Sequence, residues 1–521
     1  DAPAPDAPAV PEETVCEDAA AFTAWLDAAQ QAGYLAVLPT GEGLDTLALC
    51  DGSRVLLVER IRLGADWQPL LGRLFSDGPS KVTHNSKDLI RQLLEAGLPA
   101  DGIVFDTALA AYLLDATESG YELPRVSMRY LGHEADGAAA VFALYPVLRA
   151  RLDEAGMQRL YDEIEHPLCR VLADMELAGF LIDREALRSF GDALTGSIDA
   201  LQQSIWALAG MQVNINSPKQ LGGVLFDTLL LPAGKKTKTG WSTNADVLER
   251  LRGKHPIVQQ VLDYRMLTKL KSTYADGLLK VIAPDGRIHS HFKMTVTATG
   301  RLSSTEPNLQ NIPIRKELGA EIRRMFVAAP GMVLVDADYS QIELRLLAHI
   351  SGDEAMCRAF RESADIHRAT AAQVFGVPFE EVTALQRSRA KAVNFGIVYG
   401  ISAFSLAQDI GVFQSEAKAY MEAYLEKYAG VHAYMKHIVE QARHDGYVST
   451  LFGRRRSLPE LKSSNFQQRS FGERVALNMP IQGTAADIIK LAMVNAARRL
   501  RDERLQARLI LQVHDELIVE C

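Results

Sequence analysis

Met332-Val333-Leu334-Val335-Asp336-Ala337-Asp338-Tyr339-Ser340-Gln341-Ile342-Glu343 decides the fold of this chain, together with Leu509-Ile510-Leu511-Gln512-Val513-His514-Asp515-Glu516. Each stretch is a short run rich in Val, Ile or Leu that ends in carboxylates, and such runs predict buried strands. A buried strand that ends in an unpaired Asp is costly unless a cation lies there, and hard divalent cations prefer carboxylate oxygens. The two runs therefore predict strands that bring Asp338 and Asp515 to a two-metal phosphoryl-transfer site.

The size and composition of the chain indicate a multidomain globular protein. Its 521 residues are too many for one core, and about three or four domains are expected. There is no apolar run of about 18 residues and no signal-peptide pattern, so we expect a cytoplasmic protein without a membrane partner. The five cysteines are scattered, which predicts reduced thiols: Cys16, Cys50, Cys169, Cys357 and Cys521.

The charge of the chain is unevenly distributed. The net charge of -9 argues against a polyanionic partner. Residues 451–500, however, contain nine Lys or Arg against three Asp or Glu, a local charge of +6. A basic stripe in an acidic protein suits a nucleic-acid groove, but a solvated surface is the commoner explanation. The charge distribution alone does not decide between a nucleic-acid groove and a solvated surface.

The patterns along the chain divide it into an α/β part and an α+β part. Residues 1–13 are rich in Pro and Ala and predict a linker, which suggests that a preceding domain is absent. Strands and helices then alternate to about residue 148. Helices are predicted over about residues 157–208 and from Pro218, with Ser217 as the N-cap. Further strands are predicted at residues 287–297 and 332–335, followed by a helix-rich insertion over about residues 343–507.

One helix presents cations and aromatic rings on a single face. Arg387, Lys391, Phe395 and Tyr399 recur every four residues, so they form a slowly drifting stripe. An amphipathic surface helix would explain the pattern equally well if the helix stood alone. Two cations followed by two aromatic rings also suit a nucleoside triphosphate, with the phosphates on the cations and the base or sugar against a ring.

Several motifs, taken together and in order, resemble one family. The segments ADYSQIELR (337–345), RSRAKAVNFGIVYG (387–400) and QVHDE (512–516) resemble the polymerase motifs of family A DNA polymerases, the bacterial DNA polymerase I type. Residues 299–311 resemble the primer-template segment of this family, residues 365–370 its fingers segment and residues 474–487 its template-binding helix. The resemblance spans about residues 163–521.

The resemblance implies a fold and a domain order. An RNase H-like exonuclease-type domain (residues 14–150) would be followed by a right-hand polymerase domain (residues 151–521). Within it, the thumb is expected at about 190–285, the palm at about 286–345 and 470–521, and the fingers at about 350–465. Relatives continue beyond the position of Asp515, so the C-terminus is expected to be truncated.

The resemblance also assigns the chemistry. Asp338 and Asp515 match the metal-binding aspartates, with the Tyr339 carbonyl as a further ligand for two Mg²⁺ ions, for which Mn²⁺ can substitute. Glu516 lies next to the metals and either binds them or helps to position Asp515. Asp336 faces the same side of the strand as Asp338 but is not the matching metal-binding position. Lys391 is expected to protonate the pyrophosphate.

Substrate and DNA contacts follow from the same match. Glu343 is expected to exclude the ribose 2′-hydroxyl, and an exposed helix Glu is the alternative. Phe395 predicts discrimination against dideoxynucleotides. Tyr399 is expected to end the helix with Gly400 where the templating base is checked. The expected dNTP-binding residues are Arg387, Lys391, Phe395, Tyr399, Glu343, His367 and Gln341, and the expected DNA-binding residues are Arg301, Gln310, Asn311, Arg474, Asn478, Gln482 and His514. Residues 216–219 and 271–274 are expected to grip backbone phosphates.

The exonuclease-like domain lacks the carboxylates of an active site. Where the family carries an Asp-x-Glu strand, the chain has Leu35-Ala36-Val37-Leu38-Pro39-Thr40. Asp106 alone matches, Asn85-Ser86-Lys87-Asp88 is a near miss, and residues 138–142 read AAAVF in place of Tyr-x-x-x-Asp. One carboxylate cannot assemble a two-metal site, so proofreading is expected to be absent.

The sequence thus predicts a monomeric, nucleoid-associated DNA polymerase whose partners are primer-template DNA and dNTPs. Two alternatives stay open. A single-subunit RNA polymerase would share the metal site and the helix stripe, although Glu343 and the exonuclease-like domain argue against it. An inactive fragment that binds primer-template is the other, because of the expected truncation.

Overall fold

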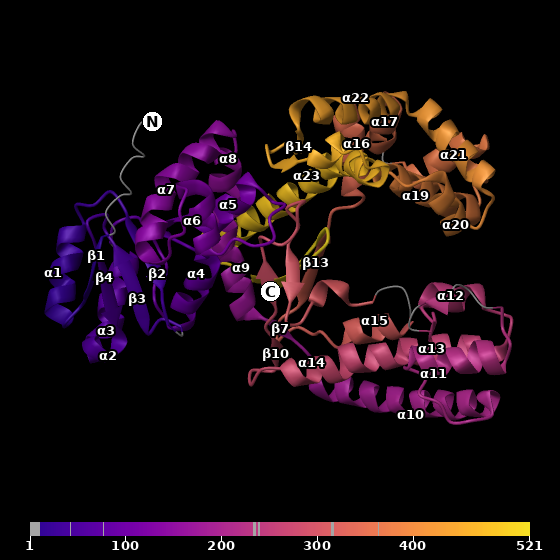
Figure 1. Cartoon of the computed structure of the whole chain (residues 1–521), viewed down its shortest axis with the longest axis horizontal. Helices are drawn as coiled ribbons and strands as arrows, with labels where there is room; N and C mark the ends of the chain where they lie inside the picture. Colours follow the sequence, from indigo (N-terminus) through magenta and orange to yellow (C-terminus); the bar gives the residue numbers. More distant parts are fainter. Residues whose placement is uncertain are drawn as a thin grey trace.

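The computed structural model describes residues 11–41, 43–76, 78–232, 236–237, 240–313, 317–362 and 364–521 (Figure 1). Most of the predicted linker, residues 1–10, lies outside the described residues. Its last two residues correct the prediction, because Glu12 and Glu13 belong to strand β1 (Glu12–Val15), which pairs in parallel with residues 54–57.

The N-terminal unit is built on a mixed six-stranded sheet with the strand order β1-β4-β3-β2-β5-β6. The central strand β2 is a run of small and branched apolar residues, of which Leu35, Ala36 and Val37 are fully buried, as expected for a strand covered on both faces. The other strands are β3 (Thr46–Cys50), β4 (Arg54–Glu59), β5 (Lys81–Thr83) and β6 (Ile103–Asp106), with β2 at Leu35–Pro39. The helices are α1 (Ala19–Ala29), α2 (Arg60–Leu63), α3 (Trp67–Ser76), α4 (Ser86–Glu95), α5 (Thr107–Leu114), α6 (Leu123–Leu131) and α7 (Gly137–Glu154).

A helical connection leads from this unit into the rest of the chain. It comprises α8 (Gln158–Leu160), the wider turn η2 (Tyr161–Glu165) and α9 (His166–Ala178). The predicted helix over residues 157–208 is interrupted, since Gly179 has a φ of +59° and short strand β7 (Phe180–Leu181) follows. The Cβ of any larger residue at 179 would lie 2.8 Å from the His289 ring.

A long helical hairpin comes next and has its own core. Helix α10 (Arg184–Ala209) packs along α13 (Pro256–Leu270), and Ile205, Leu221 and Val258 are among the buried residues between them. Ser217 accepts a hydrogen bond from the Gln220 N–H, which confirms the predicted N-cap of α11 (Pro218–Gly222). The remaining elements are η3 (Gly223–Thr228), β8 (Lys236–Thr237), β9 (Gly240–Trp241), α12 (Ala245–Arg250), η4 (Lys271–Ala275) and α14 (Asp276–Val281).

The centre of the molecule is an antiparallel three-stranded sheet with the strand order β13-β17-β16. It joins β13 (Leu334–Asp338) to the two last strands, β16 (Arg508–Val513) and β17 (Glu516–Glu520). The strand predicted over residues 287–297 is instead two short strands, β10 (Arg287–Ile288) and β11 (His291–Lys293), that pair with different partners. Nearby lie β12 (Ser303–Thr305), η5 (Leu309–Asn311) and α15 (Glu317–Arg324).

The helix-rich insertion between β13 and β16 is confirmed, although it also contains a β-hairpin. Its helices are α16 (Ile342–Ser351), α17 (Glu354–Arg361), α18 (Ile366–Phe375), α19 (Ala384–Val398), α20 (Ala403–Ile410), α21 (Gln414–Lys427), α22 (Ala429–Asp445) and α23 (Phe466–Asp502). The hairpin consists of β14 (Tyr447–Ser449) and β15 (Arg455–Ser457). Short turns η6 (Phe379–Glu381) and η7 (Pro459–Lys462) connect the helices.

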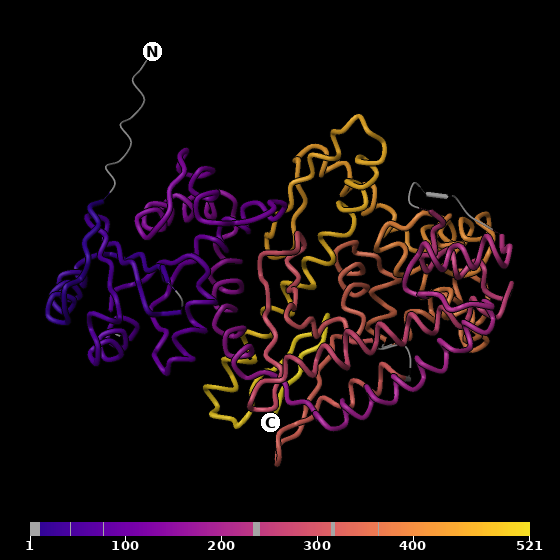
Figure 2. The backbone as a smooth tube through the Cα atoms, turned by 60° about the horizontal axis from the view of Figure 1, so that its bottom comes forward, coloured from indigo at the N-terminus to yellow at the C-terminus, as the bar shows by residue number. Residues whose placement is uncertain are grey.

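The insertion and the helical hairpin project from the same side of the three-stranded sheet, away from the N-terminal unit (Figures 1 and 2). The N-terminal unit and the sheet, in contrast, share one hydrophobic core, which runs from Cys16 to Leu517. Helix α9 lies in this core and contacts α4, α23 and β16. The sheet therefore packs on the N-terminal unit, and the two projecting parts extend from it.

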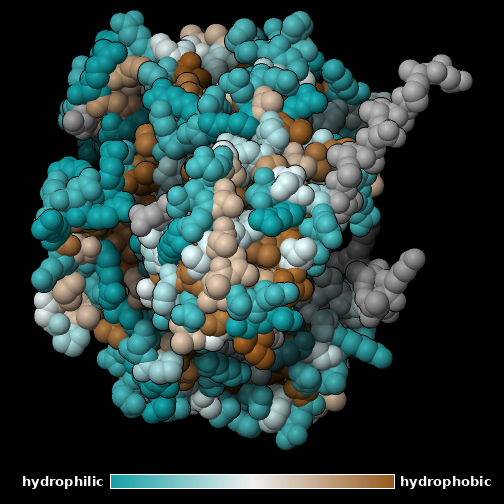
Figure 3. All heavy atoms as spheres, turned by 90° about the vertical axis from the view of Figure 1, so that its left-hand side faces the viewer, coloured by the Kyte–Doolittle hydropathy of each residue, from teal (hydrophilic) through white to brown (hydrophobic). Residues whose placement is uncertain are grey.

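The outer face of the N-terminal unit is largely hydrophilic, with scattered apolar side chains (Figure 3). None of the described helices combines the length and the apolar composition needed to cross a bilayer. All five cysteines are free thiols, as predicted, and three of them are buried.

Candidate active site

The two carboxylate-bearing stretches meet at one end of the three-stranded sheet. Strands β13 and β17 pair in antiparallel register, with Asp338 opposite Glu516. One residue further, the Tyr339 N–H donates to the carbonyl of Asp515 at 3.1 Å. Asp338 and Asp515, 177 residues apart in the sequence, thus lie on adjacent strand ends.

The two strands differ in burial, which corrects one prediction. Strand β16 is buried over Leu509–Val513, as expected. Strand β13 was predicted to be buried but is largely exposed, and Val335 keeps 48% of its surface accessible. Both strands lie at edges of the sheet, but helices α9 and α23 pack on β16, whereas β13 mainly contacts its neighbour β17. Asp338 consequently lies at an open surface rather than at the end of an enclosed strand.

Burial and the neighbouring carboxylates disfavour the charged form at this end of the sheet. The pKa of Asp515 is raised, first by burial and then by the charges of Glu343 and Asp338, although Arg301 opposes the shift. Burial and the charge of Asp336 likewise raise the pKa of Glu516. A nearby cation would reverse both shifts because it favours the charged carboxylates.

The oxygen donors at this position fit a divalent cation. Asp338 and Asp515 provide hard carboxylate ligands, and the Tyr339 backbone is adjacent to both, since Tyr339 follows Asp338 and its N–H donates to the Asp515 carbonyl. Among the described residues, no cluster of three or more His, Cys, Asp or Glu side chains is arranged to hold a metal ion. A cation here would therefore depend on these two carboxylates and on ligands from a substrate or water.

Glu343 is the centre of a hydrogen-bonded group beside the carboxylates. It is only 6% exposed, so the alternative of an exposed helix Glu is wrong. Its carboxylate pairs with the guanidinium of Arg301 and accepts a hydrogen bond of 2.9 Å from the Tyr399 hydroxyl. Burial and the charge of Glu343 raise the pKa of Tyr399 to about 12. These contacts join three residues that are distant in the sequence.

The turn before Glu343 has an unusual backbone. Gln341 adopts a left-handed conformation with a φ of +55° and precedes α16 without capping it through its side chain. The guanidinium of Arg345 donates to the Ser340 carbonyl at 2.9 Å and closes the turn. Such a conformation is costly for a residue with a Cβ and marks a position where the chain is held by its surroundings.

The predicted stripe lies on α19 and ends as expected at Tyr399, which is the C-cap, with Gly400 in the left-handed region at a φ of +63°. Arg387 pairs with Asp365 at 2.7 Å, and Lys391 is exposed. Phe395 is half-buried, with ring centroids 5.8 Å from His367 and 6.4 Å from Tyr399. Cations and rings therefore occupy successive turns of one helix.

His367 lies behind this stripe rather than on it. It is 3% exposed, and its Nδ1 lies 3.0 Å from the Asn394 amide nitrogen. Burial, followed by the charge of Arg387, lowers the pKa of His367 to about 4. The ring is therefore neutral near pH 7 and supports Phe395 without adding a positive charge.

Most of the predicted DNA-binding residues line two faces near the carboxylates. Arg474, Asn478 and Gln482 lie on successive turns of α23, where Arg474 packs against Gly400 and Gln482 interacts with Tyr399. On the other side, Gln310 donates to the Gln512 carbonyl at 3.2 Å. Gln310, Asn311 and His514 line one pocket together with Lys269 and Tyr274 from the base of the helical hairpin.

Sequence reasoning missed a buried ionic group next to this site. It consists of Glu165, Arg454, Asp487 and Lys490, all of which are at most 1% exposed. Arg454 and Lys490 account for part of the local charge of +6 in residues 451–500, so that window is not one exposed basic stripe. The signal was an Asp and a Lys on the apolar face of α23, a pattern that predicts buried, paired charges.

The N-terminal unit places its one matching carboxylate in a structural role. Asp106 is the N-cap of α5 and accepts hydrogen bonds from the Ala108 and Leu109 N–H groups. It also accepts from the Asn85 N–H and from the N–H and hydroxyl of Ser86. Both carboxylate oxygens are therefore occupied by protein donors.

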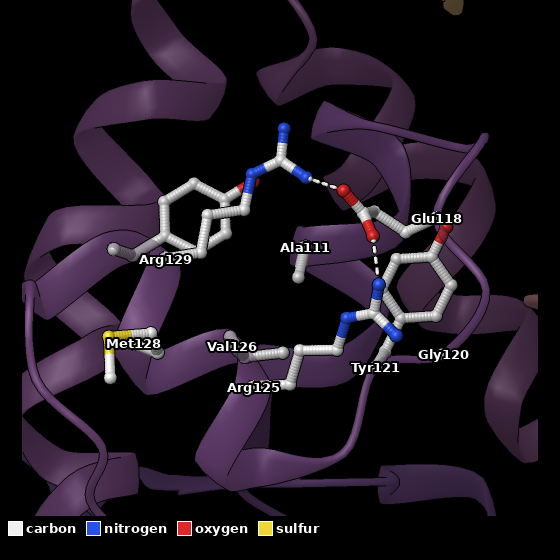
Figure 4. A pocket seen from close by; sticks show the side chains of 9 residues that line it. Ala111, Glu118, Gly120, Tyr121, Arg125, Val126, Met128 and Arg129 are labelled. Atoms are coloured by element: carbon white, nitrogen blue, oxygen red, sulfur yellow. Dashed lines mark hydrogen bonds and ion pairs between the residues drawn. The ribbon is translucent and has the colours of Figure 1, made fainter.

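A pocket in this unit lies elsewhere, between α5 and α6 (Figure 4). Glu118 receives ion pairs from both Arg125 and Arg129 at its rim. The residues that line it include neither Asp106 nor residues 85–88, so this pocket is separate from the position of Asp106.

Comparison with known proteins defines the class to which this fold belongs. Residues 184–521 match DNA polymerase family A, and the chain belongs to this family.

The similar proteins are bacterial enzymes named DNA polymerase I. The chain is 49% identical to that of Geobacillus stearothermophilus over 479 residues, which cover 87% of this chain and 55% of the relative. It is 46% identical to that of Bacillus subtilis over 474 residues, or 86% and 54% of the two chains. It therefore spans about half the length of these curated relatives.

A solved structure resembles nearly the whole chain. It is described as the POL domain of Pol1 from M. smegmatis in complex with DNA primer-template and dNTP. The TM-score is 0.91 at 42% identity, and the match covers 96% of this chain and 91% of the other.

Proposed function

We propose that this chain is a template-dependent DNA polymerase that adds dNTPs to a primer 3′-hydroxyl. The observation that carries the proposal is the meeting of Asp338 and Asp515 at adjacent strand ends, beside the Arg301–Glu343–Tyr399 group. Family membership and the primer-template and dNTP named for the similar structure support it.

In this proposal Asp338, Asp515 and the Tyr339 carbonyl hold two Mg²⁺ ions, since family A DNA polymerases generally use divalent metal ions. When bound, the ions would supply activation of the primer hydroxyl and charge stabilisation at the leaving pyrophosphate. Lys391, which is exposed on α19, donates a proton to the leaving pyrophosphate. Glu516, opposite Asp338, helps to position Asp515.

The remaining residues bind and orient the substrates. Arg387 and Lys391 contact the triphosphate, and Arg387 exchanges its partner Asp365 for a phosphate. Phe395 packs against the sugar and base, supported by the neutral ring of His367. Glu343 excludes a 2′-hydroxyl, and Gln341 lines the turn before it. Primer and template are held by Arg301, Gln310, Asn311, Arg474, Asn478, Gln482 and His514.

We infer the right-hand layout from the same arrangement. The three-stranded sheet with α23 is the palm, the helical hairpin of α10–α14 is the thumb, and the insertion of α16–α22 is the fingers. The N-terminal unit is the exonuclease-like domain. The chain acts as a monomer in the cytoplasm, associated with the nucleoid.

A primer-extension assay with Mg²⁺ tests the activity. The chain should extend a primer with dNTPs and much less with NTPs, whereas the reverse preference would favour an RNA polymerase. Asp338→Ala and Asp515→Ala should reduce extension by about 10³-fold or more while a gel shift still shows primer-template binding. Asp336→Ala is the matched control, because this exposed Asp is on the same strand but is not a proposed ligand. Binding without extension by the unmodified chain would contradict the proposal.

We also propose that the chain lacks proofreading. Support comes from Asp106, whose oxygens are saturated by five protein donors. A primer labelled at its 5′ end and carrying a mismatched 3′ terminus should stay at full length with Mg²⁺ and no dNTPs. Shortening of that primer by the purified chain, abolished in Asp106→Ala, would refute this.

A further inference from the structure

Four charged side chains form a closed group beneath the candidate active site. Arg454 donates to Asp487 Oδ1 from Nε at 2.9 Å and from Nη2 at 2.7 Å, and it also pairs with Glu165. Lys490 donates to Glu165 at 2.6 Å. The group has no net charge and joins three elements: η2, the turn before β15 and α23.

Arg454 is packed directly against the backbone of Gly300. A Cβ at residue 300 would lie 2.5 Å from Arg454 Nε and 2.7 Å from Cζ, and Gly300 has a φ of +86°. Any larger residue there would therefore collide with the guanidinium and strain the backbone. Since Arg454 is itself fixed by two carboxylates, it presents a rigid surface to this turn.

The turn, which we call loop 297–301, is held on its other sides as well. The Tyr112 hydroxyl, from the N-terminal unit, donates to the Thr297 carbonyl at 2.8 Å. The Thr297 hydroxyl donates to the Arg301 carbonyl at 2.7 Å. A Cβ at Gly483 of α23 would lie 3.2 Å from the Thr299 carbonyl oxygen.

Loop 297–301 ends at the residue that holds Glu343. Arg301 pairs with Glu343, which accepts the hydrogen bond from Tyr399. Gly300, Arg301, Lys490 and Asp515 also line one small pocket, so the ionic group and the candidate metal ligand face the same space. A contiguous set of contacts thus runs from Arg454 through Gly300 and Arg301 to Glu343.

A contribution to the stability of the fold does not by itself explain why this buried ionic group is present. Replacing a buried ion pair with well-packed apolar residues is often neutral or stabilising, so buried pairs are poor evidence of a stabilising role. The geometry offers a better explanation, because the guanidinium of Arg454 fills the space directly against Gly300.

We propose that Arg454 is a positioning residue for sugar selection. Held by Glu165 and Asp487, it sets loop 297–301, which places Arg301 and through it the Glu343 carboxylate against the 2′-carbon of the incoming nucleotide. This inference rests on the proposed polymerase function.

Two variants test the contact from opposite sides. Arg454→Lys keeps the charge but removes the guanidinium plane, and Gly300→Ala keeps all four charges but displaces the loop. For each, kcat/KM is measured for a dNTP and for the matching NTP on one primer-template. We expect the ratio of the two values to fall about tenfold in both variants, since small displacements of a positioning group have effects of this size.

The double variant and a matched control separate positioning from general damage. In Gly300→Ala/Arg454→Lys both substitutions disturb the same contact, so the losses in the ratio should be less than additive. Arg287→Lys is the control: it alters another buried Arg–carboxylate pair, with Glu520, and should leave the ratio unchanged even if stability falls.

The outcomes are distinguishable. If the chain extends primers but the ratio is unchanged in both single variants, or falls equally in Arg287→Lys, the inference is overturned and the proposed function stands. If Arg454→Lys does not fold, Gly300→Ala decides, because it keeps all four charged side chains. A chain that extends no primer would overturn the proposed function and this inference with it.

Discussion

Glu343 is a carboxylate fixed from two sides, by the guanidinium of Arg301 and by the hydroxyl of Tyr399. Shortening it removes the group expected to crowd a ribose while leaving a small space in its place. Glu343→Ala should therefore raise the relative incorporation of ribonucleotides by about 10²-fold, measured as the ratio of kcat/KM for NTP and dNTP. An Ala variant that incorporates ribonucleotides no better than the unmodified chain would contradict the assignment.

Phe395 presents only a hydrocarbon ring at a half-buried position between His367 and Tyr399. Its ring carries no hydroxyl that could substitute for the 3′-hydroxyl of a substrate that lacks this group. We therefore expect the chain to incorporate dideoxynucleotides at least about tenfold less efficiently than deoxynucleotides. Competition between ddTTP and dTTP in single-nucleotide extension measures this, and equal use of the two would contradict it.

His367 gives a residue-level prediction about acid stability. Its pKa of about 4 in the folded chain lies below the ordinary value of 6.5, so the unfolded chain binds the extra proton first. The folded chain therefore has its full free energy of unfolding above pH 6.5 and loses part of it as the pH falls towards 4. In His367→Gln, the free energy of unfolding should fall by about 2–3 kcal/mol less over this pH range than in the unmodified chain. Urea denaturation at pH 7, 5.5 and 4.5 checks it, and parallel curves for the two proteins would count against it.

At the scale of elements, strand β17 begins directly after Asp515, with Glu516, and is held in place at its far end. Glu520 is fully buried and accepts hydrogen bonds from Arg287, Arg508 and the Ala329 N–H. Burial alone would raise its pKa, but these donors hold the pKa of Glu520 below its usual value. The strand is therefore secured by pairing on both edges and by a buried ionic anchor.

Glu520→Gln should accordingly weaken the sheet. Because the folded pKa is depressed, the stabilisation is present above about pH 4.5 and disappears as the pH falls through the folded value. We expect a loss of about 3–5 kcal/mol at pH 7, as for other broken buried pairs, and a smaller loss at pH 4. Chemical denaturation at both pH values tests this. A loss that does not depend on pH would show that the charge of Glu520 is not the cause.

The elements also show which parts of the fold could be predicted from sequence patterns. Helix α19 and the cap of α11 follow local rules, so their positions could be predicted closely. The exposure of β13 could not, because its apolar residues are typical of a buried strand, and burial depends on which distant helices pack on a strand, as α9 and α23 do on β16. The pairing of Arg301 with Glu343 could not be predicted either, because it depends on how distant segments pack.

At the scale of the molecule, the N-terminal unit and the three-stranded sheet share one core, whereas the helical hairpin has its own. The four tryptophans report on both parts, since Trp25 and Trp67 lie in the first and Trp206 and Trp241 in the second. In a Trp206→Phe/Trp241→Phe variant, the urea midpoint of Trp fluorescence should coincide with the disappearance of primer extension. A fluorescence midpoint well below the urea concentration that abolishes activity would show that the N-terminal unit unfolds independently.

The motifs that place the candidate site are dense enough for the family to be assigned from the sequence alone. What they could not reveal is that Glu165, outside every motif, meets Arg454 and Lys490 in one buried group. Charge counts over residues 451–500 summed buried and exposed side chains alike, so they could not separate a binding surface from an internal network.

The capping role of Asp106 has a consequence for protein engineering. Building a two-metal editing site into this scaffold would require more than grafting acidic residues into β2 and α7. Asn85, with its left-handed φ of +65°, and Ser86 form a turn that already encloses the Asp106 oxygens. A designer would first have to rebuild that turn so that Asp106 is released from its own backbone, at the expense of the start of α5.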